Sequence, residues 1–315
     1  MKIVFLDAKT IGDDIDLSGY DTLGEVVKYD FSTSEEVPAR AADADVLVLN
    51  KVQVNEQTIG SARNLKLVCV TATGTNNLDK DSLAKRNIAW RNVAGYSTES
   101  VAQHTFAMLF YLLEKLRYYD DYVKDGRYVN DTIFTHFAEH FFQISGKTWG
   151  IIGLGNIGKR VADIAKAFGA NVIYYSTSGK NIQDGYTRVD FDTLLTSSDI
   201  ISVHAPLTPE TEGLMNAEAF SKMKPSAVFL NLGRGPIVIE EDLATALEEG
   251  KLAAAGLDVL CIEPMCADNP LLRIQDSKKL LITPHIAWAS VEARTNLMNI
   301  ILKQIQDWQK ERGTI

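Results

Sequence analysis

A glycine-rich turn is the feature that most restricts how this chain can fold. Residues 153–158 read Gly-Leu-Gly-Asn-Ile-Gly and follow a short apolar run at 149–152. They open a helix-like stretch at 159–168, and a second apolar run occupies 171–175. A strand, a glycine turn, a helix and a second strand within about 30 residues are typical of a dinucleotide-binding fold. An ordinary strand–helix turn is the weaker interpretation in this context.

The three glycines have separate physical tasks in such a turn. Gly153 permits the tight turn, Gly155 lets the backbone approach a pyrophosphate, and Gly158 lets helix and strand pack closely. The first turn of the helix then presents N–H groups and the positive end of the helix dipole to the phosphates. The sequence therefore predicts a dinucleotide site at this helix N-terminus.

Composition excludes several classes of protein. The chain has 315 residues, which predicts about two domains, and 46% hydrophobic residues, which is ordinary for a globular protein. No apolar run reaches the roughly 18 residues of a membrane span. The net charge is −9 without a basic block, so we expect neither nucleic acid nor membrane as a partner. Three cysteines form no disulfide or zinc pattern, which favours a reducing cytoplasm.

The first hundred residues predict a small α/β unit. Apolar runs at 46–49 and 67–70 are typical of buried parallel strands, and 88–90 is a shorter strand candidate. The stretch 78–86 between two of them has a helical pattern. We therefore expect this unit to form a sheet of its own.

A long helix is expected to begin at Ser97 or Thr98 and to run to about Lys124, with apolar residues along one face. The following stretch to Gly146 is rich in aromatic residues, namely Phe134, Phe137, Phe141 and Phe142. An exposed aromatic arm usually marks a partner surface, so 98–146 is predicted to be the dimerisation helix and arm of a homodimer. The alternative is that the arm folds back on its own domain.

The remainder of the chain predicts a doubly wound parallel sheet, because six strand candidates alternate with helical stretches. Its later strand candidates are 200–203, 227–230, 254–257 and 280–282. A last helical stretch, about 291–310, has no place in that sheet and could return to the first unit. We expect a discontinuous first domain, 1–97 plus 289–315, and a dinucleotide-binding domain, 98–288.

The choice of dinucleotide depends on the end of the second strand. NAD-specific sites carry an acidic residue there, which bonds the ribose 2′-hydroxyl. Here the position falls near Ser176, and residues 175–180 contain no carboxylate. Ser176, Thr177 and Lys180 could instead bind a 2′-phosphate. We expect the protein to use both NAD(H) and NADP(H), with a weak preference for NADPH. The alternative is that these residues form a solvated turn with no role in cofactor choice and that the enzyme uses NAD.

Three residues beyond strand ends can carry chemistry. Arg234 follows the strand candidate 227–230 between two glycines, and a guanidinium can hold a carboxylate with two parallel hydrogen bonds. His285 follows 280–282 and can exchange a proton at a carbonyl or hydroxyl near neutral pH. Glu263 lies beyond 254–257 and can orient that histidine. Each residue alone could have a purely structural role, but the three together favour a catalytic site.

These motifs give the chain a resemblance to the D-isomer-specific 2-hydroxyacid dehydrogenases over essentially its full length. The matching stretches are 73–79, 101–105, 153–158, 231–235, 256–259 with Glu263-Pro264, and Pro284-His285. The tracts 95–105 and 285–290 resemble the glycerate dehydrogenase (hydroxypyruvate reductase) branch. The resemblance implies an α/β fold of two Rossmann-like domains with parallel sheets and an active-site cleft between them. The flavodoxin-like domain, 1–97 plus 289–315, would be the substrate (catalytic) domain, and 98–288 would be the NAD(P)-binding Rossmann domain.

The resemblance also implies roles for individual residues. Arg234 would bind the substrate carboxylate and carbonyl, His285 would donate the proton to the keto acid, and Glu263 would be its partner. Backbone amides of Thr73 and Gly74 would hold the other side of the carboxylate. The residues implied at the cofactor are Asn156 and Ile157 at the pyrophosphate, Asp258 at the nicotinamide carboxamide, and the flanking segment His204, Ala205, Pro206 and Thr208. Ser176, where many relatives carry aspartate, puts strict NAD use in doubt.

Substrate choice is less determined. Asn50 ends a first-domain strand that faces the expected cleft. Trp288 either walls the pocket, which favours small acids such as hydroxypyruvate or glyoxylate, or packs at the hinge. Pyruvate, giving D-lactate, and phenylpyruvate stay open. Two further alternatives are a dinucleotide-sensing corepressor without turnover and a related dehydrogenase of formate or phosphonate.

Overall fold

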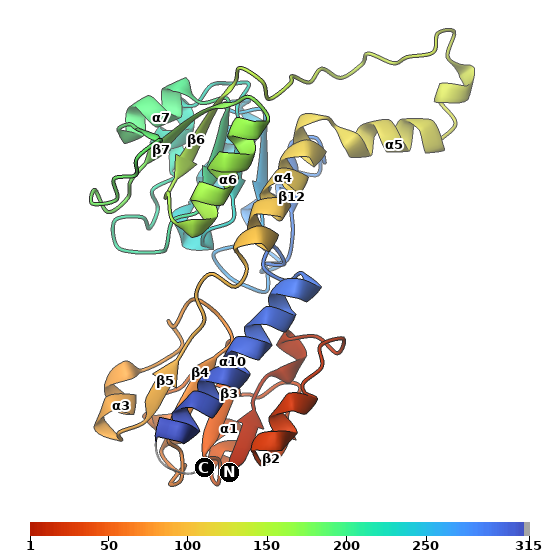
Figure 1. Cartoon of the computed structure of the whole chain (residues 1–315). Helices are drawn as coiled ribbons and strands as arrows, with labels where there is room; N and C mark the ends of the chain where they lie inside the picture. Colours follow the sequence, from red (N-terminus) through yellow and green to blue (C-terminus); the bar gives the residue numbers. More distant parts are fainter. Residues whose placement is uncertain (312–315) are drawn as a thin grey trace. The chain divides into compact units, whose positions relative to one another are not determined.

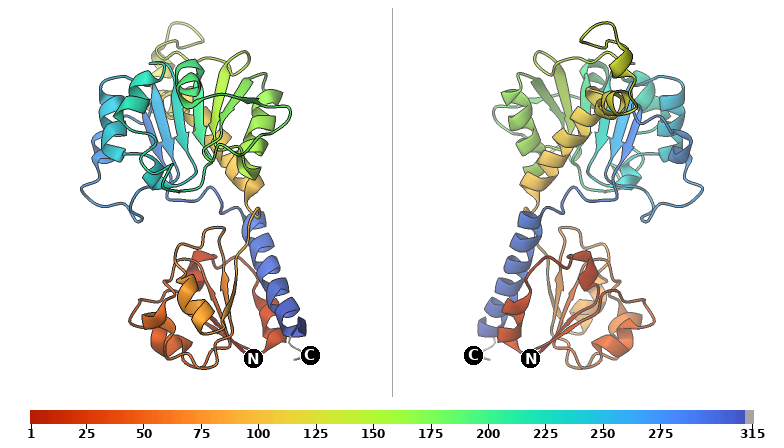
Figure 2. Two further views of the ribbon diagram at one scale, coloured as in Figure 1. Left: turned by 90° about the vertical axis from the view of Figure 1, so that its left-hand side faces the viewer. Right: turned by 90° about the vertical axis from the view of Figure 1, so that its right-hand side faces the viewer.

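Residues 1–311 are described in the computed structural model, and the chain divides into two compact units. The N-terminal unit combines residues 1–97 with the segment that begins at 289, and the central unit comprises 98–288. Each unit is a parallel β-sheet flanked by helices (Figures 1 and 2), so the predicted α/β class with two parallel sheets is confirmed. Nothing in residues 1–311 is a helix long and apolar enough to cross a membrane.

The N-terminal unit has a five-stranded sheet in the order β2-β1-β3-β4-β5. Its elements are β1 (Lys2–Phe5), η1 (Ala8–Thr10), η2 (Ser18–Leu23), β2 (Glu25–Lys28), α1 (Val37–Ala41), β3 (Val46–Leu49), α2 (Glu56–Ile59), β4 (Leu67–Val70), α3 (Lys80–Lys85), β5 (Ala89–Arg91) and α10 (Val291–Glu311). β3 and β4 are buried at every residue, as their apolar runs predicted. β2 was not predicted, because it is an edge strand that buries no residue fully.

The C-terminal helix α10 packs within the N-terminal unit, next to its first elements. The Tyr20 hydroxyl, in η2, donates to the carbonyl oxygen of Met298 at 2.7 Å. The Arg294 guanidinium forms an ion pair with Asp14 at 2.6 Å. Ile301 and Ile305 are fully buried on the same helix. These contacts explain why a helix distant in sequence completes this unit.

The central unit has a seven-stranded sheet in the order β12-β11-β10-β9-β6-β7-β8. Its elements are α4 (Thr98–Leu113), α5 (Leu116–Lys124), η3 (Tyr128–Asn130), β6 (Thr148–Ile152), α6 (Asn156–Ala167), β7 (Asn171–Tyr175), β8 (Thr187–Arg188), α7 (Phe191–Ser197), β9 (Ile200–Val203), α8 (Ala217–Lys222), β10 (Val228–Asn231), η4 (Gly235–Ile237), α9 (Glu240–Glu248), β11 (Ala254–Leu257), η5 (Pro270–Arg273) and β12 (Leu280–Ile282). Six strands were predicted. The seventh, β8, was not, because it consists of only two residues, both exposed, and gives no apolar signal.

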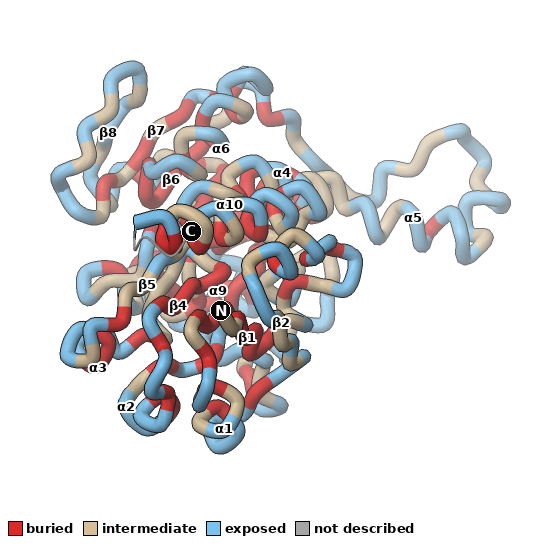
Figure 3. Tube along the Cα trace, turned by 60° about the horizontal axis from the view of Figure 1, so that its bottom comes forward, coloured by how far each residue is buried: buried red, intermediate tan, exposed pale blue. Residues whose placement is uncertain are grey.

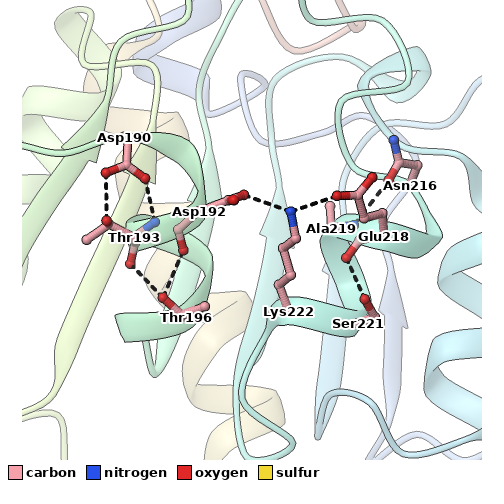
Figure 4. A network of polar contacts seen from close by, with 9 residues as sticks. All are labelled: Asp190, Asp192, Thr193, Thr196, Asn216, Glu218, Ala219, Ser221 and Lys222. Carbon is pink, nitrogen blue, oxygen red and sulfur yellow. Dashed lines mark hydrogen bonds and ion pairs between the residues drawn. The ribbon is translucent and has the colours of Figure 1, made fainter.

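Strand order reverses between β6 and β9, since the chain passes from β6 to β7 on one side and later returns to β9 on the other. Ligands in doubly wound sheets bind beyond the carboxyl ends of the strands at such a switch point. α4 and α6 bury their apolar residues against one face of the sheet, while α7, α8 and α9 cover the other. Figure 4 shows Lys222 of α8 bridging to α7, with ion pairs to Asp192 at 2.9 Å and Glu218 at 2.7 Å.

The helix expected over 97–124 is broken into α4 and α5, so that prediction was wrong. Lys115 lies between them with a φ of 56°, in the left-handed region that interrupts an α-helix. Its ammonium donates to the carbonyl of Lys278 at 3.1 Å. The apolar periodicity continues past this residue and therefore did not reveal the break. In Figures 1 and 3, α5 leads into an arm that extends from the sheet and is mostly exposed.

Candidate active site

The glycine turn after β6 has the geometry of close backbone packing. Gly153 has a φ of 91°, and a Cβ at this position would lie 2.7 Å from the backbone of Ala205, which follows β9. A Cβ at Gly158 would lie 2.3 Å from the Gly153 carbonyl oxygen. Any larger residue at either position would collide with backbone atoms. Glycine is therefore required here to bring the turn, α6 and the β9 end together.

The space in front of this turn fits a dinucleotide phosphate. A Cβ added at Gly155 would meet no described atom within 4 Å, so the side open to a ligand is free. Gly155 is also the N-cap of α6, and no side chain caps the first helical N–H groups of Asn156 and Ile157. Such a helix start binds anions through its backbone donors and its dipole. The residues present therefore fit the predicted pyrophosphate site.

His204 lies at the end of β9 and is an unusual polar group. Both ring nitrogens are buried, and neither has a hydrogen-bond partner among the described residues. Burial lowers the pKa of His204 to about 3, so the ring is neutral at physiological pH. A buried ring without partners at the switch point is consistent with a ligand that supplies them. This is a second feature that fits a bound dinucleotide.

The segment from Ala205 to Thr208 is held by a residue that the sequence analysis missed. Thr211 is fully buried; its hydroxyl donates to the Pro206 carbonyl at 2.8 Å and accepts from the Thr208 amide at 2.8 Å. This threonine therefore fixes the loop beyond β9. The available signal in the sequence was a second threonine three residues after Thr208, but this pattern is too common to assign a role to Thr211.

Ser176 follows β7 directly and is buried, whereas Ser178, Gly179 and Lys180 are exposed. The Ser176 carbonyl accepts from the Gly179 amide at 3.1 Å, which closes a turn. Asn181 ties this turn to the glycine turn, because its side-chain amide donates to the Leu154 carbonyl at 2.8 Å. Ser176, Thr177 and Lys180 are thus gathered beside the glycine turn. A role in cofactor choice stays a prediction.

Arg234 is presented by a tightly built loop after β10. Asn231 is fully buried; its side chain donates to the Arg234 carbonyl at 3.0 Å and accepts from the Gly233 amide at 3.0 Å. A Cβ at Gly235 would lie 1.9 Å from the backbone of Leu260, so the loop packs directly against the loop that leads to Glu263. Asn231 is part of the sequence motif 231–235, but no role was predicted for it. In the structure its side chain holds the backbone of the loop on either side of Arg234.

Glu263 and His285 form a pair beyond β11 and β12. The Nδ1 atom of His285 lies 2.8 Å from Oε2 of Glu263, and Oε1 of the glutamate accepts from the Leu260 amide at 3.0 Å. A carboxylate only accepts hydrogen bonds, so Nδ1 carries a hydrogen and the ring's other nitrogen, Nε2, is left to act on a ligand. The carboxyl edge of the sheet thus carries Arg234, Glu263 and His285 on three consecutive strands.

Asp258 is buried at the end of β11, and both of its oxygens face the loop that carries His285. Oδ1 accepts from the Ile286 amide at 2.9 Å and from the Thr283 hydroxyl at 2.6 Å, while Oδ2 accepts from the Ala287 amide at 2.9 Å. The sequence analysis placed Asp258 at the nicotinamide carboxamide, and that assignment stays a prediction. The hydrogen bonds identify a structural task that the resemblance did not suggest.

The predicted substrate residues of the N-terminal unit follow its own strand ends. Asn50 is buried after β3, and its amide donates to the Asp7 carboxylate at 2.9 Å. Thr73 follows β4, and its hydroxyl donates to the Val93 carbonyl at 3.0 Å, with Gly74 next to it. Trp288 is partly buried and packs on the α4 side of the central core. Their contact with substrate stays a prediction.

A doubly wound sheet with a glycine turn at its switch point and an acid–base pair at the same edge defines a class, the nicotinamide-dependent dehydrogenases. Sequence comparison identifies the family within that class. Residues 106–287 match the model described as D-isomer specific 2-hydroxyacid dehydrogenase, NAD binding domain. The chain belongs to this family of oxidoreductases, and its central unit is the nucleotide-binding part.

Individual relatives agree with this assignment. A hydroxypyruvate reductase of Blautia hydrogenotrophica is 37% identical over 98% of this chain and 97% of its own length. A glycerate dehydrogenase of Methylorubrum extorquens is 36% identical over 97% of this chain and 94% of its own. Among solved structures, an acyclic imino acid reductase in complex with NADPH and D-Arg superposes with a TM-score of 0.86 at 29% identity, covering 99% of this chain and 98% of that one.

Proposed function

We propose that this protein reduces a small 2-keto acid, with hydroxypyruvate or glyoxylate favoured, to the D-2-hydroxy acid. The observation that carries the proposal is the His285–Glu263 pair at 2.8 Å on the sheet edge that also holds the glycine turn. The full-length similarity to a hydroxypyruvate reductase and a glycerate dehydrogenase supports the choice of substrate. Both names describe the same interconversion, read in opposite directions.

A nicotinamide dinucleotide bound at this edge supplies the hydride for the carbonyl carbon. Arg234 holds the substrate carboxylate with its forked guanidinium, whose Nη1 is fixed by donation to the Gly233 carbonyl at 2.8 Å. Protonated His285 gives the proton on Nε2 to the oxygen that becomes the hydroxyl group. Glu263 fixes the orientation of the ring and stabilises its positive charge. Arg234 also stabilises negative charge that develops on the substrate oxygen.

A panel of four 2-keto acids tests the proposed substrate. Hydroxypyruvate, glyoxylate, pyruvate and phenylpyruvate are each supplied with NADH and with NADPH, and the loss of nicotinamide absorbance is followed. The largest kcat/KM is expected for hydroxypyruvate or glyoxylate. Preference for pyruvate or phenylpyruvate would move the protein to a D-lactate or phenyllactate dehydrogenase and overturn the favoured substrate. Turnover with none of the four would favour a corepressor that senses the dinucleotide.

For the cofactor, we propose dual use with preference for NADPH. The Ser176–Lys180 turn carries hydroxyls and an ammonium and no carboxylate, so it would not repel a 2′-phosphate. A further cation lies beside it: Nη2 of Arg188, from β8, would be 4.0 Å from a Cβ added at Gly179. Arg188 has an exposed side chain and was not considered in the sequence analysis, because β8 was not predicted. Solved relatives are bound to either cofactor, the imino acid reductase to NADPH and a D-lactate dehydrogenase of Aquifex aeolicus to NAD, which supports the proposal of dual use.

Arg188→Ala is expected to raise the Kd for NADPH about 10- to 100-fold, since a hydrogen bond to a charged group contributes about 1.5–3 kcal/mol. The Kd for NADH should stay nearly constant in the same variant, which makes it the internal control. Nicotinamide fluorescence measures both constants. Equal weakening of NADH and NADPH, or no change in either, would remove Arg188 from the 2′-phosphate site.

We propose a homodimer formed through the arm of the central unit. Phe134, Phe137 and Phe141 are 89%, 73% and 59% exposed, and an apolar surface of this kind usually marks a protein interface. Phe142 differs, because it packs against the core of its own unit. Light scattering should give twice the mass of one chain for the wild type. A monomer at micromolar concentration would contradict this proposal.

We also propose the cytoplasm as the compartment. Cys69, Cys261 and Cys266 are all free thiols, and no pair of them forms a disulfide. Disulfides are rare where glutathione and thioredoxin keep thiols reduced. The cysteines therefore support a reducing compartment, which cell fractionation would test.

A further inference from the structure

His104 belongs to a motif, residues 101–105, for which the proposed reaction gives no task. It lies in α4, and its Nε2 atom is 3.1 Å from Oγ1 of Thr283, immediately after β12. The same Nε2 atom is 3.6 Å from Oδ1 of Asp258. Thr283 donates to that carboxylate oxygen at 2.6 Å. These distances define a chain of polar contacts from α4 through Thr283 to Asp258.

The direction of each hydrogen bond in this chain follows from the chemistry of the groups. A threonine hydroxyl has one hydrogen, and a carboxylate oxygen can only accept. The Thr283 hydrogen therefore goes to Asp258, so the Thr283 oxygen must accept from His104. Nε2 of His104 consequently carries a hydrogen. This assignment gives His104 a directed task as the donor that orients the Thr283 hydroxyl toward the aspartate.

Asp258 in turn holds the backbone on both sides of His285. It accepts from the side chain of Thr283, two residues before the histidine, and from the amides of Ile286 and Ala287, directly after it. His285 itself has a φ of 55°, a left-handed conformation that is unfavourable for a residue with a Cβ. Such a conformation persists only where surrounding contacts fix it, and the Asp258 contacts are in the right place to do so.

A second contact from α4 reaches the other end of the same loop. The Ser100 hydroxyl donates to the Ala287 carbonyl at 2.6 Å. Ser100 and His104 are four residues apart, so they lie on one face of the helix, one turn from each other. α4 thus forms hydrogen bonds to both ends of the loop 283–287, and His285 lies between the two contacts.

We propose that His104 is a positioning residue for His285, acting through Thr283 and Asp258, and that α4 is the element against which the proton donor is aligned. The inference rests on the proposed role of His285 as that donor. Loss of the Thr283 hydroxyl removes one of the three donors that the loop gives to Asp258. Loss of the His104 donor leaves that hydroxyl without the contact that orients it toward the aspartate, so either change weakens the hold on the His285 backbone. A misplacement of about 1 Å at a reacting group can cost about 100-fold in rate.

Paired variants separate this task from simple packing. Thr283→Val keeps the shape and removes the hydroxyl, while Thr283→Ser restores it. His104→Leu removes the donor, while His104→Gln places an amide N–H near the position of Nε2. We expect kcat to fall about 10- to 100-fold in Thr283→Val and His104→Leu. In Thr283→Ser and His104→Gln it should return to within about 5-fold of wild type. Gln103→Ala, at an exposed neighbour on α4, is the control expected to keep wild-type kcat.

Two further readouts distinguish positioning from general damage. The KM for the keto acid and the Kd for NADPH should change less than about 3-fold in every variant. NMR of histidine labelled with ¹³C at Cε1 should show a shifted His285 resonance in Thr283→Val and His104→Leu, and an unshifted one in Gln103→Ala. The His285 resonance is assigned by its loss in His285→Gln. This readout needs no turnover, so it tests the positioning even if none of the 2-keto acids is a substrate.

Three results would overturn the proposal. The first is a wild-type kcat and an unshifted His285 resonance in both Thr283→Val and His104→Leu. The second is a fall in kcat accompanied by a comparable rise in the KM for the keto acid and in the Kd for NADPH, because that pattern marks disruption of the whole unit. The third is failure of Thr283→Ser to recover the rate, because the hydroxyl would then not be the group that matters.

Discussion

Replacement of His285 by alanine is expected to lower kcat for 2-keto acid reduction about 10²–10⁴-fold, which is the usual contribution of a general acid. The expected loss lies mainly in the rate, because the ring that pairs with Glu263 at 2.8 Å supplies a proton and not the carboxylate-binding charge. The Kd for NADPH, followed by nicotinamide fluorescence, should stay close to the wild-type value. Steady-state kinetics at saturating cofactor measure the change.

A matched control for this variant is His140→Ala. His140 is one of five histidines, lies on the arm of the central unit and is exposed. It should keep the wild-type kcat. Near-normal turnover of the His285→Ala enzyme would reject His285 as the proton donor, whatever the behaviour of the control.

Replacement of Arg234 by alanine should affect binding and rate together. Removing one partner from a desolvated, hydrogen-bonded charge pair costs about 2–5 kcal/mol, so kcat/KM should fall on the order of 10³-fold. Both KM and kcat are expected to change, because the guanidinium holds the carboxylate and also stabilises charge on the reacting oxygen. Arg234→Lys should recover only part of the loss, since an ammonium keeps the charge but cannot form two parallel hydrogen bonds.

Arg160→Ala is the corresponding control, because Arg160 pairs at the surface with the exposed Glu99 at 2.8 Å. Exposed ion pairs contribute about 0–1 kcal/mol, so this variant should retain its activity. If Arg234→Ala raised KM alone and left kcat unchanged, the guanidinium would only bind substrate. Its proposed stabilisation of the developing charge would then be wrong.

Local patterns predicted most of the fold. The glycine turn at 153–158 is a contiguous signal, and the buried strands β3, β4, β9 and β11 are apolar at every or nearly every position. The edge strands β2 and β8 were missed, because they bury little and their sequences show no apolar run. The break between α4 and α5 was missed because the apolar periodicity continues past Lys115, the residue with the left-handed φ.

In the candidate site, too, some residues could be predicted from the sequence and others could not. Arg234, Glu263 and His285 could be proposed from sequence because each follows a strand, and the carboxyl ends of parallel strands meet at one edge. The contacts that hold them could not, since they link residues far apart in the chain: Asp258 with Ile286, or His104 with Thr283. Arg188 escaped notice because only the pairing of β8 with β7 brings it beside Gly179. Sequence thus indicated the chemical groups, and the fold added the residues that orient them.

The configuration of the product tests the central claim most directly. Purified protein is incubated with hydroxypyruvate and excess NADPH, and the glycerate formed is separated on a chiral column. The account predicts D-glycerate in an amount equal to the NADPH consumed, because hydride and proton are delivered by a fixed arrangement of one cofactor, Arg234 and His285. L-glycerate, a racemic product, or no consumption of NADPH with this or any other small 2-keto acid would contradict it.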